Sequence, residues 1–203
     1  MTALRSAFSF AVLVFATGSL GAQPAPAPPP AVTVLKAARM FDARSDRILS
    51  NAVVIVEGSK VREAGAGLAI PAGATVIDLG DATLLPGFID CHTHLTGESS
   101  DNWLADFYEG LRRPATEQAF FAALYARKTL ESGFTTVRDV GSSDAIDVGL
   151  RNAINQGLTP GPRMLVAREA IGATGGHCDR GGFPPATFGE EPGPSKGIIA
   201  GPE

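Results

Sequence analysis

The chain reads Leu85-Pro86-Gly87-Phe88-Ile89-Asp90-Cys91-His92-Thr93-His94-Leu95 at the point where its sequence pattern changes. The apolar run at residues 88–92 predicts a β-strand that ends at a pair of histidines. Side chains two residues apart on a strand share a face, with Cα atoms about 6.5–7 Å apart. His92 and His94 are therefore predicted to lean toward one metal ion, at roughly 2.0–2.1 Å per bond. Asp90 shares that face and is expected to orient an imidazole or another inward-facing group.

Two histidines separated by one residue are weak evidence by themselves, because such pairs also occur as structural residues. The context favours a metal site. A β-rich segment and a Pro-Gly turn precede the strand, an acid stands two residues before the pair, and helices alternate with strands after it.

Helices and strands alternate downstream of the histidine pair. The expected elements are a helix at 115–132, a strand at 134–138, a helix at 143–156 and a strand at 163–167. Gly133 suits a left-handed C-cap, and Ser142 or Ser143 suits the N-cap of the second helix. This order is typical of a parallel α/β sheet or barrel, and a (β/α)8 barrel needs about 250 residues. Residues 87–203 are therefore expected to form an incomplete barrel of three to four units, each of about 30 residues.

The segment before the histidine pair has the pattern of a small β-unit. Its expected strands are residues 32–35, 52–57, 60–63, 75–79 and 83–85. Gly58-Ser59 between two of them suits a two-residue hairpin turn. Residues 32–86 are thus predicted to be the N-terminal part of a β-sandwich domain, and the fold class of the whole chain is predicted to be α/β.

The N-terminus has the pattern of an export signal. Arg5 precedes an uncharged, mostly apolar run at residues 7–20, and small residues follow. Fourteen helical residues reach only about 21 Å, short of the roughly 30 Å hydrocarbon core, which disfavours a membrane anchor. Residues 1–22 are predicted to be a signal peptide and residues 23–31 a Pro/Ala-rich linker. The protein is then periplasmic or secreted, without a stable membrane anchor after cleavage.

Composition excludes one class of partner. The net charge is −4, from 17 basic and 21 acidic residues, without a dense Lys/Arg cluster. Nucleic-acid binding is therefore not expected. Cys91 is expected to be a small buried residue and Cys178 a loop residue, so a disulfide between them is disfavoured. The oligomeric state is left open.

Three segments resemble one protein family. Residues 86–94 resemble the P-G-[FL]-I-D-x-H-x-H signature of the amidohydrolase superfamily. Thr135-Thr136-Val137-Arg138-Asp139 is similar to the second-strand segment of its prolidase-like and imidazolonepropionase-like branch. Gly161-Pro162-Arg163, followed by Thr174-Gly175-Gly176-His177, is similar to the third strand and its loop in that branch.

The resemblance implies a barrel that holds one or two divalent ions, usually zinc, with His92 and His94 as the first two ligands. In that family the remaining ligands come from the fourth, fifth, sixth and eighth strands. These lie beyond residue 203, so no catalytic residue is expected within this chain, which the resemblance makes an N-terminal fragment. The implied chemistry is attack of a metal-activated water on a carbonyl group. In the family, an aspartate from the eighth strand serves as the proton shuttle.

The implied activity is hydrolysis of carbon–nitrogen bonds in a small molecule or dipeptide, of the Xaa-Pro dipeptidase type. A cyclic-amide hydrolase or a deaminase on the same scaffold is the second hypothesis. A truncated, catalytically inactive fragment is the third.

Other polar and aromatic residues near the predicted barrel mouth have two interpretations each. His177, in a Gly-rich loop, either contacts substrate or is an ordinary loop residue. Arg138 and Asp139 are expected to form a structural ion pair, with lining of the mouth as the alternative. Trp103, Phe107 and Tyr108 are expected to pack within the first strand–helix unit, with shaping of the substrate pocket as the alternative.

Overall fold

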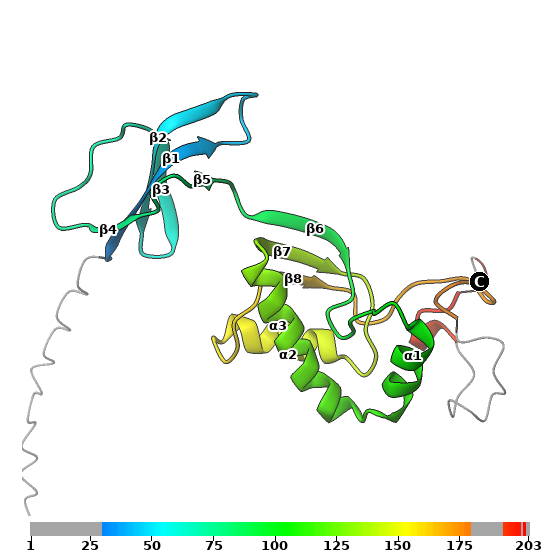
Figure 1. The fold of residues 1–203 in the computed structure, drawn as a ribbon. Coiled ribbons are helices and arrows are strands. Elements are labelled where there is room, and N and C mark those ends of the chain that lie inside the picture. Colours follow the sequence, from blue (N-terminus) through cyan, green and yellow to red (C-terminus); the bar gives the residue numbers. More distant parts are fainter. Residues whose placement is uncertain (1–29, 180–192, 200, 202–203) are drawn as a thin grey trace, which may run out of the picture. The chain divides into compact units, whose positions relative to one another are not determined.

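The computed structural model describes residues 30–179, 193–199 and 201 (Figure 1). The chain divides into two compact units. Unit 1 comprises the residues up to Arg39 together with Leu49–Ala82, and unit 2 comprises Met40–Ile48 and the residues from Thr83 onward. The predicted signal peptide and all but the last two residues of the predicted linker lie outside the described residues.

Unit 1 is built on one sheet. Its strands are β1 (Val32–Phe41), β2 (Ile48–Glu57), β3 (Lys60–Ala66) and β4 (Thr75–Asp78), and β5 (Thr83–Leu84) pairs with β1. The order is β3-β2-β1-β4. The predicted hairpin is confirmed, since β2 and β3 pair antiparallel and Gly58 adopts a φ of 59° between them. β1 pairs parallel with β4.

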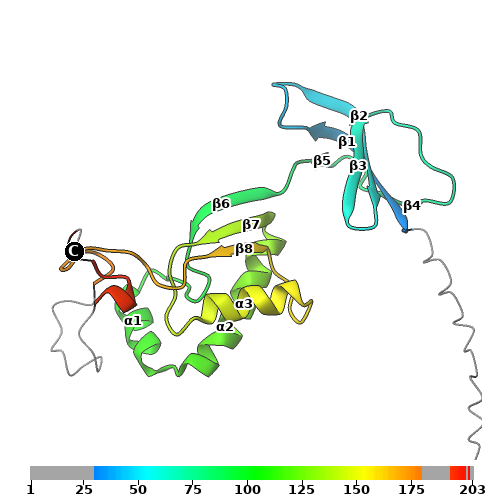
Figure 2. The same cartoon turned by 180° about the vertical axis from the view of Figure 1, so that it is seen from behind.

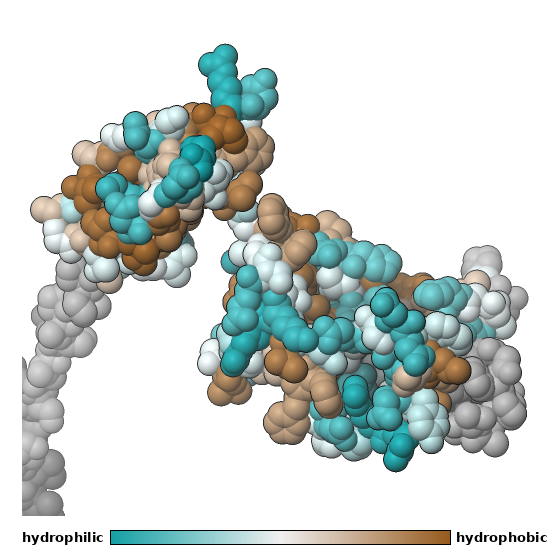
Figure 3. All heavy atoms as spheres, in the orientation of Figure 1, coloured by the Kyte–Doolittle hydropathy of each residue, from teal (hydrophilic) through white to brown (hydrophobic). Residues whose placement is uncertain are grey.

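The core of unit 1 is small. Val34, Val53 and Ile55 are buried, and Val32, Leu68 and Ala74 pack against them. Apolar side chains also remain on the surface, as the brown areas of this unit in Figure 3 illustrate. The exposed set includes Val61, Ile70, Val76, Ile77 and Leu79. The described residues form a single sheet here, so the predicted sandwich stays a prediction.

Unit 2 has the predicted alternation of strands and helices. Its elements are β6 (Phe88–Thr93), α1 (Trp103–Arg112), α2 (Ala115–Glu131), β7 (Phe134–Asp139), α3 (Ile146–Asn155), β8 (Arg163–Val166) and η2 (Pro194–Lys196). The three strands form a parallel sheet in the order β6-β7-β8. Figures 1 and 2 show α2 and α3 on the same side of this sheet. The α/β class is confirmed, and the incomplete barrel stays a prediction.

The core of unit 2 lies between the sheet and these two helices. Ala122 and Ala126 of α2, Val137 of β7 and Met164 of β8 are buried in it, with Ile146, Leu150 and Leu95. Small residues on α2 let that helix lie close to the strands. Gly133 ends α2 with a φ of 97°, as its predicted capping role requires.

The start of α3 differs from the prediction. α3 begins at Ile146, because Asp144 and Ala145 adopt left-handed φ angles of 55° and 56° before it. The Ser142 hydroxyl accepts a hydrogen bond from the Asp147 amide at 3.4 Å, but the N-cap position is Ala145.

The aromatic residues of α1 are also placed differently from the prediction. No residue of α1 is buried, and Trp103 and Tyr108 are 71% and 58% exposed. Packing within the first strand–helix unit therefore does not explain them. Cys91 is exposed rather than buried, because β6 has only β7 beside it among the described strands. Cys91 and Cys178 are both free thiols, as predicted. No described helix has the length and apolar character needed to cross a membrane.

The first prediction concerns Gly87, immediately before β6. A Cβ atom at this position would collide with the Thr135 side chain of β7. Gly87→Ala should therefore lower the free energy of unfolding by about 1–3 kcal/mol, the usual cost of forcing extra atoms into a packed site. Urea denaturation measures this change through the transition midpoint.

Gly149→Ala is the matched control. Gly149 is exposed within α3, and a Cβ there would meet no heavy atom within 4 Å. Alanine in a helix interior is more stable than glycine by roughly 0.5–1 kcal/mol, so this variant should be slightly stabilised. Equal changes in the free energy of unfolding of Gly87→Ala and Gly149→Ala would contradict the close approach of Gly87 to β7.

Candidate metal centre

The two predicted metal ligands lie next to each other at the end of β6. His92 is the fifth residue of this strand and His94 directly follows it. Their ring centroids are 5.6 Å apart and the ring planes cross at 73°. Both side chains are exposed. The predicted proximity of the two rings, at the end of a strand in a parallel sheet, is therefore present.

The spacing of the rings can be compared with the geometry of a shared ion. A ring nitrogen about 2.0–2.1 Å from a zinc ion places its ring centroid roughly 3.2 Å from that ion. Two imidazoles on one ion then have centroids at most about 6.4 Å apart. The observed 5.6 Å lies within that limit, so the spacing of the two rings is compatible with the predicted sharing of one ion.

The hydrogen bond of His94 determines which of its ring nitrogens can bind a metal. Its Nδ1 lies 2.8 Å from the backbone oxygen of Gly141. A carbonyl oxygen only accepts hydrogen bonds, so Nδ1 carries the hydrogen and donates it. Nε2 is then unprotonated in the neutral ring, with its lone pair available for a metal. A backbone carbonyl on the far nitrogen is a common way to orient a metal-binding histidine.

Asp90 has a different contact from the one predicted. Its Oδ1 accepts a hydrogen bond from the backbone N–H of His92 at 2.9 Å. The expectation that Asp90 orients an imidazole or another inward-facing group stays a prediction, since the hydrogen bond that the structure gives it goes to the backbone. The carboxylate fixes the backbone at His92, since a side chain two residues back reaches the main chain more easily than the ring.

Asp139, at the end of β7, has contacts that the sequence analysis did not predict. Its side chain is fully buried. Oδ2 accepts from the Leu95 N–H at 2.7 Å, and Oδ1 accepts from the Gly141 N–H at 3.3 Å. Arg138 is exposed, so the predicted ion pair between these neighbours is replaced by hydrogen bonds to the backbone. The sequence offered one signal for this burial. Side chains two residues apart on a strand face the same side, so Asp139 faces the helices together with Val137.

Burial raises the pKa of Asp139 above its usual value. The hydrogen bonds from Leu95 and Gly141 oppose this change, and the nearby Asp147 carboxylate adds to it. Asp147 is likewise fully buried, and it accepts hydrogen bonds from the backbone N–H groups of Val148 and Arg168, each at 2.8 Å. Two buried carboxylates therefore hold the backbone behind the histidine pair.

His177 lies in the loop that follows β8. It is exposed. The loop is held by hydrogen bonds from Gly172 to Gly197 and from Ile199 to Gly172, and the Asp179 carboxylate accepts from the Gly175 N–H at 2.6 Å. The structure gives His177 no contact with His92 or His94, so its predicted role in substrate binding stays a prediction.

The described residues bring two imidazoles together without a third candidate ligand. In residues 30–179, 193–199 and 201, no group of three or more His, Cys, Asp or Glu side chains is arranged to hold a metal ion. A tetrahedral zinc site has four ligand positions, so the metal-binding role of His92 and His94 stays a prediction.

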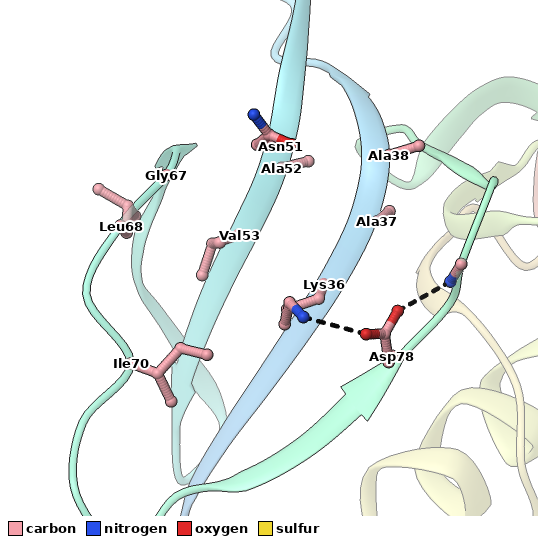
Figure 4. A pocket seen from close by; sticks show the side chains of 11 residues that line it. Lys36, Ala37, Ala38, Asn51, Ala52, Val53, Gly67, Leu68, Ile70 and Asp78 are labelled. Atoms are coloured by element: carbon pink, nitrogen blue, oxygen red, sulfur yellow. Dashed lines mark hydrogen bonds and ion pairs between the residues drawn. The ribbon is translucent and has the colours of Figure 1, made fainter.

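Unit 1 has a surface hollow that contains no histidine. It is open, has a volume of about 370 Å³ and is lined by β1, β2 and the segments around Leu68 and Asp78. Figure 4 shows its one ion pair, between Lys36 Nζ and Asp78 Oδ2 at 3.0 Å. Both charged groups are exposed, and each pairs with the other, so the charged residues that line this hollow form an ordinary surface ion pair.

Comparison with known proteins identifies the family of this chain. The model of a family described as the amidohydrolase family matches residues 83–193, more than half of the chain. This range contains β6, β7 and β8, and with them both histidines.

Individual relatives cover parts of the same range. Ochratoxinase from Aspergillus niger is 34% identical over 99 residues, which are 47% of this chain and 19% of that protein. Imidazolonepropionase from Mycolicibacterium smegmatis is 34% identical over 140 residues, which are 66% of this chain and 31% of that protein. Among solved structures, a Xaa-Pro dipeptidase with bound methionine in its active site has 32% identity and a TM-score of 0.71. That match covers 85% of this chain and 42% of the dipeptidase.

The chain thus spans less than half the length of each of these relatives. Within that span, the family model, the sequence identities and the similarity to a solved structure agree. The chain belongs to the amidohydrolase family.

Proposed function

We propose that this chain contributes His92 and His94 as two ligands of a divalent-metal centre in a hydrolase of carbon–nitrogen bonds. One observation carries the proposal: the two rings lie 5.6 Å apart while Gly141 holds the Nδ1 of His94. That arrangement leaves Nε2 of His94 unprotonated in the neutral ring, beside a second imidazole. Membership of the amidohydrolase family supports the same chemistry.

A divalent ion such as zinc, when bound, supplies a water of lowered pKa and polarises the scissile carbonyl group. The residues of this chain have separate tasks around it. His92 and His94 hold the ion, and the Gly141 carbonyl fixes the ring of His94. Asp90 fixes the backbone of His92. Zinc is proposed because imidazole nitrogen is among its common ligands, and one or two ions fit the family pattern.

The proposed substrate is a dipeptide of the Xaa-Pro type. The similarity to a Xaa-Pro dipeptidase, over 85% of this chain, supports this class. His177 is proposed to contact the substrate from the loop after β8, where its exposed ring is free to meet a ligand. Export through residues 1–22 to the periplasm or the medium suits the scavenging of peptides and is part of the proposal.

A cyclic amide is the second candidate substrate. Imidazolonepropionase from Mycolicibacterium smegmatis is 34% identical over 66% of this chain, which favours it. Both substrates present a carbonyl carbon bonded to nitrogen, so the same metal chemistry serves either. Testing both substrates on a longer protein that includes this sequence separates the two candidates.

The second prediction concerns metal binding by the chain itself. Zinc titration followed by calorimetry should detect binding that depends on both imidazoles. His92→Gln and His94→Gln should each weaken it by more than about tenfold, the loss that removal of even a supporting residue commonly causes. His177→Gln is the matched control and should leave the affinity unchanged. Unaltered zinc affinity in His92→Gln and His94→Gln would contradict the proposal.

The third prediction concerns turnover. The described residues offer the pair of imidazoles without a third group arranged to bind an ion, so we expect that the 203-residue chain by itself does not hydrolyse dipeptides. The assay is amine release from an Xaa-Pro dipeptide panel at saturating zinc, with an authentic Xaa-Pro dipeptidase as positive control. Zinc-dependent release above the rate without protein would show that the described residues suffice for catalysis.

A further inference from the structure

We propose that Asp139 is a positioning residue that sets the orientation of the His94 ring through Leu95 and Gly141. The importance of this orientation for catalysis rests on the metal-binding role proposed for His94. The orientation itself is a property of the chain without metal.

The hydrogen bonds around Asp139 enclose the His94 ring. One carboxylate oxygen accepts from the N–H of Leu95, the residue directly after His94, at 2.7 Å. The other accepts from the N–H of Gly141 at 3.3 Å. The carbonyl of Gly141 in turn lies 2.8 Å from Nδ1 of His94. A single side chain therefore holds both the backbone that carries the ring and the residue that binds it.

A carboxylate suits this place for a chemical reason. Both backbone partners of Asp139 are donors, and a carboxylate offers two acceptor oxygens and no hydrogen of its own. An asparagine amide would satisfy one N–H and present its own N–H group to the other. Because Asp139 is fully buried, water cannot replace the lost acceptor.

The Gly141 loop has little freedom to adjust. A Cβ on Gly141 would lie 2.6 Å from the Cβ and 3.0 Å from the backbone nitrogen of Ala170. Glycine therefore permits this close approach of the loop to the segment after β8. The next residue, Ser142, donates its N–H to the Arg168 carbonyl at 2.8 Å. The segment after β8 contacts the loop on one side, and the Asp139 carboxylate accepts the Gly141 N–H on the other. Together these contacts fix the direction of the Gly141 carbonyl.

Asp147 provides a matched control in the same core. It is as fully buried as Asp139 and also accepts two backbone hydrogen bonds. Its partners are the N–H groups of Val148 and Arg168, and Arg168 meets the Gly141 loop only through its carbonyl, which accepts from Ser142. Asp147→Asn should therefore disturb the core, while the Asp139 carboxylate still accepts from Leu95 and Gly141 and keeps the His94 ring in place.

The test is the tautomer of His94, read from long-range ¹H–¹⁵N correlations of the imidazole rings at a pH where they are neutral. The chain has three histidines, so His94→Gln assigns the His94 signals. Wild type should show hydrogen on Nδ1 of His94. Asp139→Asn should move that ring toward hydrogen on Nε2 and weaken zinc binding by about 10–100-fold, as for other residues that orient a ligand. Asp147→Asn should retain the wild-type tautomer.

Each outcome separates this inference from the proposed function. A folded Asp139→Asn variant with unchanged tautomer and zinc affinity overturns the inference and leaves the metal site intact. A tautomer change in a chain that binds no zinc supports the inference and contradicts the metal site. If Asp139→Asn does not fold, couplings across hydrogen bonds in wild type decide. Couplings from Leu95 nitrogen to the Asp139 carboxylate and from His94 Nδ1 to the Gly141 carbonyl must both be present, and absence of either overturns the inference.

Discussion

The parallel pairing of β6 with β7 is the constraint on which the candidate site depends. Thr93 pairs with Asp139, and the Val140 N–H donates to the Thr93 carbonyl at 3.0 Å beyond the end of β7. Parallel strands that end together bring their following residues to one edge of the sheet. Residues 44 to 47 positions apart in the sequence meet there for this reason. Without this register, His94 would have neither the Gly141 carbonyl nor the carboxylate behind it.

The site combines exposed ligands with a buried support. His92 and His94 are exposed, as residues that receive an ion must be, whereas Asp139 and Asp147 have no exposed surface. Ionised carboxylates in an apolar core are costly unless hydrogen bonds compensate them. Backbone N–H groups provide that compensation here. Burial of these two carboxylates is unfavourable by itself, but their hydrogen bonds hold the backbone at the strand ends in one conformation.

The sequence predicted the elements that follow simple periodicity and missed those that depend on tertiary contacts. β6, its histidine pair and the alternation after it follow from apolar runs and helical spacing. Asp139 was misassigned because proximity along the chain suggested Arg138 as its partner, while the folded strand turns the two side chains to opposite faces. The predicted helix at 143–156 starts earlier than α3 does. The Asp147 carboxylate accepts a hydrogen bond from the Arg168 N–H, and no local sequence signal reveals that contact. Burial of Cys91 was inferred from strand parity alone, without knowing which neighbours β6 would have.

X-ray absorption at the zinc edge tests the central claim most directly, namely that His92 and His94 share one ion. The suitable sample is the His177→Gln variant loaded with one equivalent of zinc, in which the pair supplies the only imidazoles of the chain. The account predicts two imidazole nitrogens per zinc at about 2.0–2.1 Å, recognised by the outer-ring scattering of imidazole. A spectrum with no imidazole, or with one imidazole per zinc, would contradict it.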